Sequence, residues 1–300
     1  MTFEERLAAT ASRIAAALDE ALGPVAMPAG QVPDRLAAAM RHAVLAGGKR
    51  VRPFLVLESA ALFGVVEERS WPVALALELV HCYSLAHDDL PAMDNDELRR
   101  GRPSVWKAFD EWTAILAGDA LLTLAFETMA RGAGGLPSTG ALMAGLAQAA
   151  GAAGMVGGQC LDLEADKLGL PRDPSVQHVM RLQALKTGAL FTFACRAGAL
   201  LGDASQRESE ALERYAGALG AVFQLADDLL DAEGEAGVVG KATGKDAAAG
   251  KATLIGLMGL ERAHARLAGL KQEGLAALDC FGRRADVLRE LMLFAVRRRS

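Results

Sequence analysis

Apolar residues recur along almost the whole chain at the spacing of an α-helix. Leu36, Met40 and Val44 form one such series, and a second series begins at Leu75. Residues three or four positions apart share one face of a helix, whereas residues two apart share one face of a strand. The pattern therefore predicts an all-α chain.

Glycine and proline divide this pattern into many helices of ordinary length. They gather at Gly23-Pro24, Gly47-Gly48, Gly64, Gly101 to Pro103, Gly132 to Pro137, Gly169 to Pro174, Gly202 and Gly234 to Gly250. Both residues favour turns and helix ends. Because no linker-like tract separates two halves, we expect one domain over residues 1–300, a large antiparallel helical bundle.

Composition agrees with helices packed around a large core. The chain is 52% hydrophobic but only 5% aromatic, and Ala and Leu dominate its apolar residues. Both residues lose little conformational freedom in a helix. The net charge of −5 argues against a nucleic-acid partner, because broad binding to nucleic acid needs a basic face.

One long stretch, between Arg131 and Asp162, contains no charged residue. It is mostly Ala and Gly and includes Gln148 and Gln159, whereas a membrane span needs about 20 strongly apolar residues. We expect a tightly packed core helix and no membrane span.

The cysteines and the first residues bear on the compartment. Cys82, Cys160, Cys195 and Cys280 lie far apart without a C-x-x-C pair, which predicts buried thiols in a reducing compartment. Charged residues interrupt positions 1–20, so we expect no signal peptide and a cytoplasmic location.

An acidic cluster lies at Asp227-Asp228-Leu229-Leu230-Asp231. On a helix, Asp231 lies within about 60° of both Asp227 and Asp228, so three carboxylates share one face. Carboxylates this close repel one another unless a cation compensates, and Mg²⁺ prefers such oxygen ligands together with phosphate oxygens.

A second acidic cluster, Asp88-Asp89-Leu90-Pro91-Ala92-Met93-Asp94, lies earlier in the chain. A regular helix would carry Asp94 about 140° to 240° away from the pair, but Pro91 disfavours helix and predicts a break. The break would bring Asp94 back. Either cluster alone also fits a solvated helix end; the two together favour a metal site.

Basic residues accompany the acids. The segment from Gly47 to Pro53, GGKRVRP, joins two helices. Arg99-Arg100 follows the acidic cluster Asp88 to Asp94. Lys186-Thr187 lies in apolar sequence, where burial of a charge is costly without an anion. A glycine-rich loop with Lys241, Lys245 and Lys251 resembles a lid, although a mobile surface loop is the alternative. Acids for Mg²⁺, bases for phosphate and an apolar interior suit ionisation of an allylic diphosphate.

The quoted motifs closely resemble the trans-isoprenyl diphosphate synthases, particularly the bacterial members that make farnesyl diphosphate. ELVHCYSLAHDDLPAMDNDELRRGR (Glu78 to Arg102) is similar to the first aspartate-rich region of that family, and FQLADDLLD (Phe223 to Asp231) to the second. GGKRVRP, KTG and GKATGKD match in the same order. Two departures are Trp106, where relatives often carry a small polar residue or His, and Lys251 to Ile255, which lacks an aromatic residue and a proline.

The resemblance implies a fold, a reaction and a set of site residues. The fold is a helical bundle around a deep apolar cavity, usually a homodimer, and the reaction joins isopentenyl diphosphate head to tail with dimethylallyl or geranyl diphosphate. The expected metal ligands are Asp88, Asp94 and Asp227, for three Mg²⁺ ions that Mn²⁺ can replace, with Asp89, Asp228 and Asp231 in support. The expected allylic diphosphate ligands are Arg99, Lys186, Thr187, Gln224 and Lys241. The expected isopentenyl diphosphate ligands are Lys49, Arg52, His81 and Arg100.

Product length is expected to depend on Tyr83 and Ser84. Tyr83 precedes Asp88 by about 7.5 Å along a helix, so its ring would form the floor of the cavity for a growing chain. This predicts farnesyl diphosphate, with geranylgeranyl (or geranyl) diphosphate as the alternative because Ser84 is small. Tyr83 could instead simply pack between helices. A terpene cyclase or a non-catalytic modulating subunit fits less well, because the chain keeps both acidic motifs and the basic set.

Overall fold

The computed structural model describes residues 1–24, 26, 30–237 and 253–297. The chain divides into two compact units. The first unit comprises Met1–Leu57 with Val65–Met143, and the second comprises Glu58–Gly64 with Ala144–Ser300. The expectation of one domain over residues 1–300 stays a prediction, because the division into two compact units does not show whether each unit folds independently.

The first unit is built from helices and one very short hairpin. Its elements are α1 (Phe3–Ala21), α2 (Asp34–Val44), the first part of α3 (Val51–Ala61), α4 (Glu67–Asp88), β1 (Leu98–Arg99), β2 (Arg102–Pro103), α5 (Val105–Ala108), α6 (Glu111–Gly132) and the first residues of α7 (Thr139–Ala150). The two strands pair antiparallel, with Arg99 opposite Arg102. This hairpin follows the acidic cluster that begins at Asp88.

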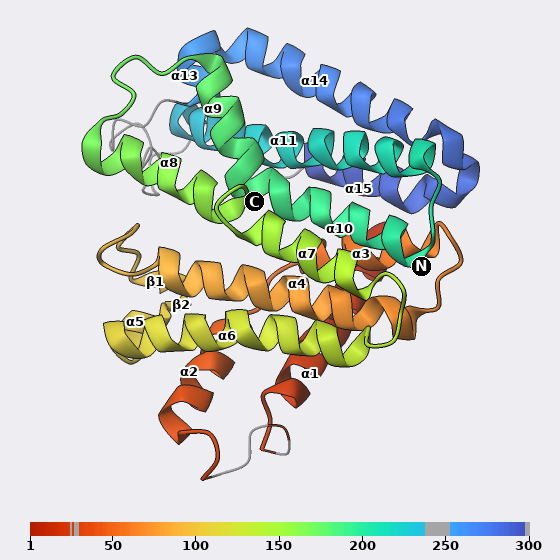
Figure 1. Ribbon diagram of the computed structural model, residues 1–300. Coiled ribbons are helices and arrows are strands. Elements are labelled where there is room, and N and C mark those ends of the chain that lie inside the picture. The colour runs from red at the N-terminus through yellow and green to blue at the C-terminus, as the bar shows by residue number, and fades with distance from the viewer. Residues whose placement is uncertain (25, 27–29, 238–252, 298–300) are drawn as a thin grey trace. The chain divides into compact units, whose positions relative to one another are not determined.

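Helix α4 is the core of the first unit. It is buried on almost every side, including at Ala74, Leu77 and Val80, and it runs beside α6 (Figure 1). A helix that is apolar all round belongs in the interior of a large core. The C-terminal end of this rigid helix carries Asp88, so packing fixes the position of the acidic cluster.

The second unit is a layered set of helices. Its elements are the ends of α3 and α7, α8 (Met155–Leu168), α9 (Val176–Gln183), η1 (Ala184–Gly188), α10 (Ala189–Leu201), α11 (Gln206–Gly237), α13 (Leu254–Met258), α14 (Leu260–Ala277), η2 (Asp279–Ala285) and α15 (Asp286–Arg297). Helix α11 lies between α10 and α14 in Figure 1 and packs on both. Its buried Tyr215 donates a hydrogen bond of 2.7 Å to the Leu288 carbonyl of α15, which ties two helices far apart in sequence.

A π-helical turn, η1, joins α9 to α10 without a break in the helix. A π-turn holds one residue more than an α-turn and is frequent at functional sites. Lys186 and Thr187 lie inside it.

The all-α prediction is confirmed, since β1 and β2 are the only strands in the described part of the chain. The prediction that all four cysteines are buried is half wrong. Cys82 and Cys195 are buried, but Cys160 and Cys280 are exposed because they lie on the outward faces of their elements.

Length and apolar composition alone would let three described helical stretches cross a membrane. These are Glu111–Gly132, Thr139–Leu168 and Val176–Leu201. The expectation of no membrane span stays a prediction.

Candidate active site

The acidic cluster after α4 forms a closed loop. The helix ends at Asp88, before Pro91, as the position of the proline predicts. The Asp94 amide then donates to the Asp88 carbonyl at 2.9 Å, and Asn95 takes a left-handed conformation with φ of 53°. Asn tolerates that region better than most residues. The loop thus returns Asp94 to the end of the helix that carries Asp88.

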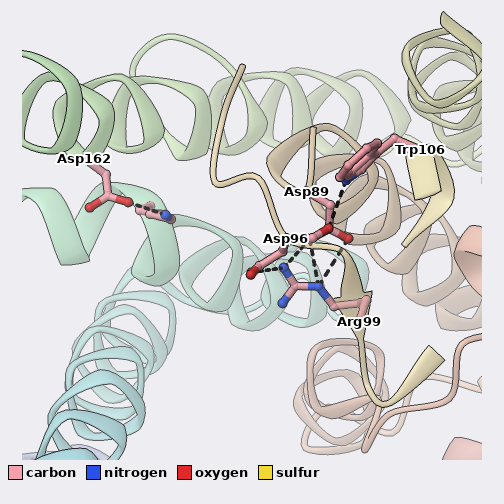
Figure 2. Close-up of polar contacts among 6 residues, drawn as sticks. Asp89, Asp96, Arg99, Trp106 and Asp162 are labelled. Atoms are coloured by element: carbon pink, nitrogen blue, oxygen red, sulfur yellow. Dashed lines mark hydrogen bonds and ion pairs between the residues drawn. The ribbon is translucent and has the colours of Figure 1, made fainter. Parts of the chain in front are cut away.

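The Asp89 side chain is buried and forms an ion pair with Arg99. Its side chain is 2% exposed, and the Arg99 guanidinium donates to its carboxylate, with Nε 3.0 Å from Oδ1 (Figure 2). Burial raises the pKa of Asp89, while the hydrogen bond and charge of Arg99 oppose that rise. Since its oxygens already accept from Arg99, Asp89 suits a supporting role better than that of a metal ligand.

Trp106 braces the same loop. Its indole N–H donates to the Asp96 carbonyl at 2.9 Å, and Arg99 also lies 3.5 Å from an Asp96 carboxylate oxygen (Figure 2). Lys107 lies over the indole ring, 5.3 Å from its centroid. The residue that departs from the family pattern therefore has a structural contact to the acidic loop.

A buried ion pair fastens the basic loop to α4. Arg50 and Glu78 form a salt bridge with side chains only 1% and 2% exposed, and Arg50 also donates to the Val44 carbonyl. The Cys82 thiol lies 3.7 Å from the same guanidinium. An ion pair buried this deeply is stable only when both partners stay hydrogen-bonded. The pair therefore holds the segment between Lys49 and Arg52 in place.

The expected isopentenyl diphosphate ligands gather around this loop. Arg52 donates to His81 Nε2 at 3.2 Å, and Arg100 donates to the Gly47 carbonyl. Burial first, and then the charge of Arg52 and Arg100, lower the pKa of His81 well below its usual value. The imidazole is therefore neutral and accepts from Arg52. The exposed ammonium of Lys49 lies on the same loop.

Gly48 makes this arrangement possible. Its φ is 114°, a conformation that residues with side chains rarely adopt, and a β-carbon there would clash with the Arg100 guanidinium.

The second unit carries a polar network between η1 and α11. Lys186 Nζ lies 2.6 Å from the Asp162 carboxylate of α8. Thr187 donates to the Gln224 side-chain carbonyl at 3.3 Å, and Gln224 in turn donates to Asp228 at 3.0 Å. Gln183 also donates to Asp228, at 3.1 Å. The structure thus places Lys186, Thr187 and Gln224, expected to bind the allylic diphosphate, in contacts with Asp228, expected to support the metal ligands, and with two further residues, Asp162 and Gln183.

The acidic side chains form an open donor set. Asp227 and Asp228 are half-buried and Asp231 is exposed on α11. Among the described residues, no three acidic, His or Cys side chains converge into a ready-made metal cage. Carboxylates with incomplete protein cages fit Mg²⁺, which keeps waters and takes phosphate oxygens as further ligands. The assignment of Asp88, Asp94 and Asp227 as metal ligands stays a prediction, and Lys241, Lys245 and Lys251 lie outside the described residues.

Four residues of these networks were missed by the sequence analysis: Arg50, Glu78, Asp162 and Gln183. Glu78 had a detectable signal, because it is the one charged residue within the apolar run Val73 to Val80. Asp162 likewise ends the charge-free stretch. Arg50 and Gln183 lie near predicted ligands in the sequence, but no periodic pattern distinguishes them from polar residues that are exposed to solvent.

The residues expected to set product length lie on the buried face of α4. Tyr83 packs edge-on against His87 with ring centroids 5.8 Å apart, and burial raises its pKa to about 12. His87 Nε2 lies 2.9 Å from the Ile115 carbonyl of α6, and its ring fills the space over Gly118. Ser84 donates to the His81 carbonyl at 2.9 Å. Tyr83 therefore has a packing role, and its role as a floor stays a prediction.

An all-α scaffold that carries an acidic loop after α4, acidic residues on α11 and basic clusters is typical of enzymes that act on diphosphate substrates. The polyprenyl synthetase family model matches residues 33–275, and the chain belongs to that family. Members of the family depend on divalent metal ions and use isoprenyl diphosphates, and this chain is a prenyltransferase.

Two curated relatives and one solved structure illustrate the similarity. The farnesyl diphosphate synthase of Escherichia coli (strain K12) is 40% identical over 284 residues, which cover 93% of this chain and 92% of the relative. That of Bacillus subtilis (strain 168) is 39% identical over 87% of this chain and 88% of the relative. The crystal structure of an FPP/GFPP synthase from Zymomonas mobilis superimposes with a TM-score of 0.86 at 41% identity, covering 98% of this chain and 99% of that one.

Proposed function

We propose that this protein condenses isopentenyl diphosphate with dimethylallyl diphosphate and then with geranyl diphosphate, and releases farnesyl diphosphate. One observation carries the proposal. Arg52 and Arg100, together with neutral His81, form a cationic cluster beside the acidic loop, in addition to the polar network that contains Lys186. A terpene cyclase binds one diphosphate, whereas a chain-elongating synthase must bind two.

The reaction separates an allylic cation from a diphosphate anion, and different side chains would bind each substrate. The C1–O bond of the allylic diphosphate breaks, its electron pair leaves with the diphosphate, and the double bond of isopentenyl diphosphate attacks the allylic cation. A proton then leaves the new chain for the released diphosphate. Lys186, Thr187 and Arg99 would hold the leaving diphosphate, and Arg52 and His81 would orient the second substrate.

Mg²⁺ is the proposed metal, with three ions per site and Mn²⁺ able to replace it. Asp88, Asp94 and Asp227 would hold the ions, which would supply positive charge to balance that of the leaving group. The apolar surroundings of α4 keep water from the cation.

The assembly and the location are proposals as well. Trp112, Ile115 and Leu116 are adjacent on α6 and 57%, 44% and 48% exposed. Exposed apolar residues that cluster on one helix favour a protein interface, and we propose a homodimer. A cytoplasmic location fits the spaced cysteines.

Product analysis tests the function directly. Labelled isopentenyl diphosphate, dimethylallyl diphosphate and Mg²⁺ should yield farnesyl diphosphate on chromatography, and excess EDTA should abolish turnover. A C20 product would favour the second candidate, geranylgeranyl diphosphate, since a geranylgeranyl pyrophosphate synthase of Arabidopsis thaliana is 42% identical over 238 residues, which cover 78% of this chain and 66% of the relative. No elongation at all would contradict the proposal.

A further inference from the structure

A cleft of about 750 Å³ lies within the second unit. Residues of α9, η1, α10, α11, α13 and α14 enclose it, and all of them belong to that unit. Protein interiors are close-packed and contain few voids larger than a water molecule. Small-molecule sites, by contrast, occupy about 300–1,000 Å³ and have mainly apolar walls with a few polar groups. The volume of the cleft therefore matches that of a ligand site.

The space is open because small residues form much of its wall. Gly217, Ala218 and Ala221 line it from α11, and a β-carbon at Gly217 would meet no atom within 4 Å. Leu254 of α13 also lines the cleft. It belongs to the segment that departs from the family pattern, where an aromatic side chain would fill more of the space. This chain therefore keeps a volume that larger side chains would close.

The cleft is elongated along α11. On this helix its lining residues extend from Arg214 to Leu225, which is about 16 Å at a rise of about 1.5 Å per residue. They recur three or four positions apart, so they share one face of the helix. Helix α14 packs beside α11 and lines the cleft over the same number of residues, from Arg266 to Ala277 (Figure 1). An extended ligand fits this shape better than a compact one.

The charges around the cleft favour an anion at one end. Arg266 Nη1 lies 2.8 Å from the Glu273 carboxylate, so these two charges offset each other. Arg214 is exposed and has no ion-pair partner among the described residues. Gln183, near the Leu225 end, already donates to Asp228 at 3.1 Å. The uncompensated charge of the cleft is therefore the guanidinium of Arg214.

We propose that this cleft binds an extended apolar molecule with one anionic end, of the class of long-chain carboxylates. The carboxylate accepts hydrogen bonds from Arg214, and the chain runs along Ala218 and Ala221 toward Leu225. Burial of the chain provides most of the affinity, while the exposed ion pair fixes its direction. Among the lining residues, none is an expected ligand of a diphosphate or a metal ion. The inference therefore goes beyond the proposed function and does not depend on it.

Binding of dodecanoate to the full-length protein tests the role of Arg214. Calorimetry below the micelle-forming concentration compares it with dodecyltrimethylammonium, which has the same chain and a cationic head and should bind about 5-fold more weakly. Arg214→Gln should weaken dodecanoate binding by about 5-fold and remove the preference between the two probes. The control is Arg207→Gln, at an exposed arginine of α11 outside the cleft, which should change neither.

Gly217→Leu tests the cleft itself by filling it. Because the space around Gly217 is open and leucine favours a helix, we expect an unchanged or higher melting temperature. The Kd for dodecanoate should rise by more than about 10-fold. The matched control is Gly269→Leu on α14, where a β-carbon also meets nothing within 4 Å but the position does not line the cleft. It should keep wild-type binding.

Farnesoate, a carboxylate of similar chain length with methyl branches, distinguishes an isoprenoid ligand from a fatty-acyl one. Tighter binding of either carboxylate that Gly217→Leu abolishes supports the site and identifies the source. Three results would overturn the inference: no binding of either carboxylate to the wild type, equal dodecanoate binding by Gly217→Leu and the wild type, or equal wild-type affinity for the anionic and cationic probes. An inactive wild type would contradict the proposed function and leave the cleft unaffected.

Discussion

Arg50 and Glu78 show how strongly one pair of residues can control a loop. Glu78→Gln leaves the Arg50 charge buried without its counter-charge, so we expect a loss of about 3–5 kcal/mol in the free energy of unfolding. The KM for isopentenyl diphosphate should rise because Lys49 and Arg52 lose their support. Denaturant unfolding and initial rates measure the two effects.

The double variant Arg50→Met/Glu78→Leu is the control for this prediction. It removes both charges, and we expect it to be more stable than Glu78→Gln alone. Equal stability of the single variant and the wild type would show that the pair does not hold the loop.

His81 predicts a pH dependence of stability. Its folded-state pKa lies below the unfolded value of about 6.5, so below that pH the unfolded chain binds a proton that the folded chain does not. Stability from this group is therefore present above about pH 6.5 and is lost as the pH falls. We expect the wild type to lose melting temperature between pH 7 and 5 more steeply than His81→Asn, and parallel curves would contradict this.

Tyr83 carries the prediction on product length. If its ring forms the floor of the cavity, Tyr83→Ala should shift the main product from farnesyl to geranylgeranyl diphosphate or longer, as measured by chromatography of labelled products. The matched control is Ser84→Ala, which removes a hydroxyl but opens little space. An active, folded Tyr83→Ala enzyme with unchanged products would leave Tyr83 only its packing against His87.

At the scale of elements, the contact between α4 and α6 depends on Gly118. A β-carbon there would displace the His87 ring and its bond to the Ile115 carbonyl, close to the end of α4 that carries Asp88. We expect Gly118→Ala to lower the melting temperature by several degrees and to reduce kcat.

Gly217→Ala on α11 is the control for that prediction. A β-carbon at Gly217 meets nothing within 4 Å, so this variant should gain about 0.4–1 kcal/mol of stability. A Gly118→Ala protein that is equally stabilised would show that the two helices have room to adjust.

Local signals explain which elements could be predicted from the sequence. Helical periodicity identified the helices, and Pro91 identified the end of α4, because both depend on neighbours in the chain. The links from Arg50 to Glu78 and from Lys186 to Asp162 join residues 28 and 24 positions apart. No periodic pattern specifies such pairs. The π-turn was also missed, since its residues keep the apolar spacing of an ordinary helix.

At the scale of the whole molecule, the exposed apolar cluster on α6 predicts the assembly. Leu116→Glu would place a charge in the proposed interface and should convert a dimer into a monomer in light scattering after size exclusion. Leu260→Glu is the control, because Leu260 is similarly exposed, at 45%, on α14. A monomeric wild type would contradict the proposed homodimer.

The π-turn at Ala184–Gly188 also determines which face of the following helix points toward the core. One extra residue in a turn rotates everything after it by about 100°, so the inward direction of Phe191, Phe193 and Cys195 depends on that residue. Deletion of one residue from this turn would restore regular winding and turn those side chains away from the core. The position of Lys186, the proposed diphosphate ligand, and the packing of α10 therefore both depend on the same extra residue.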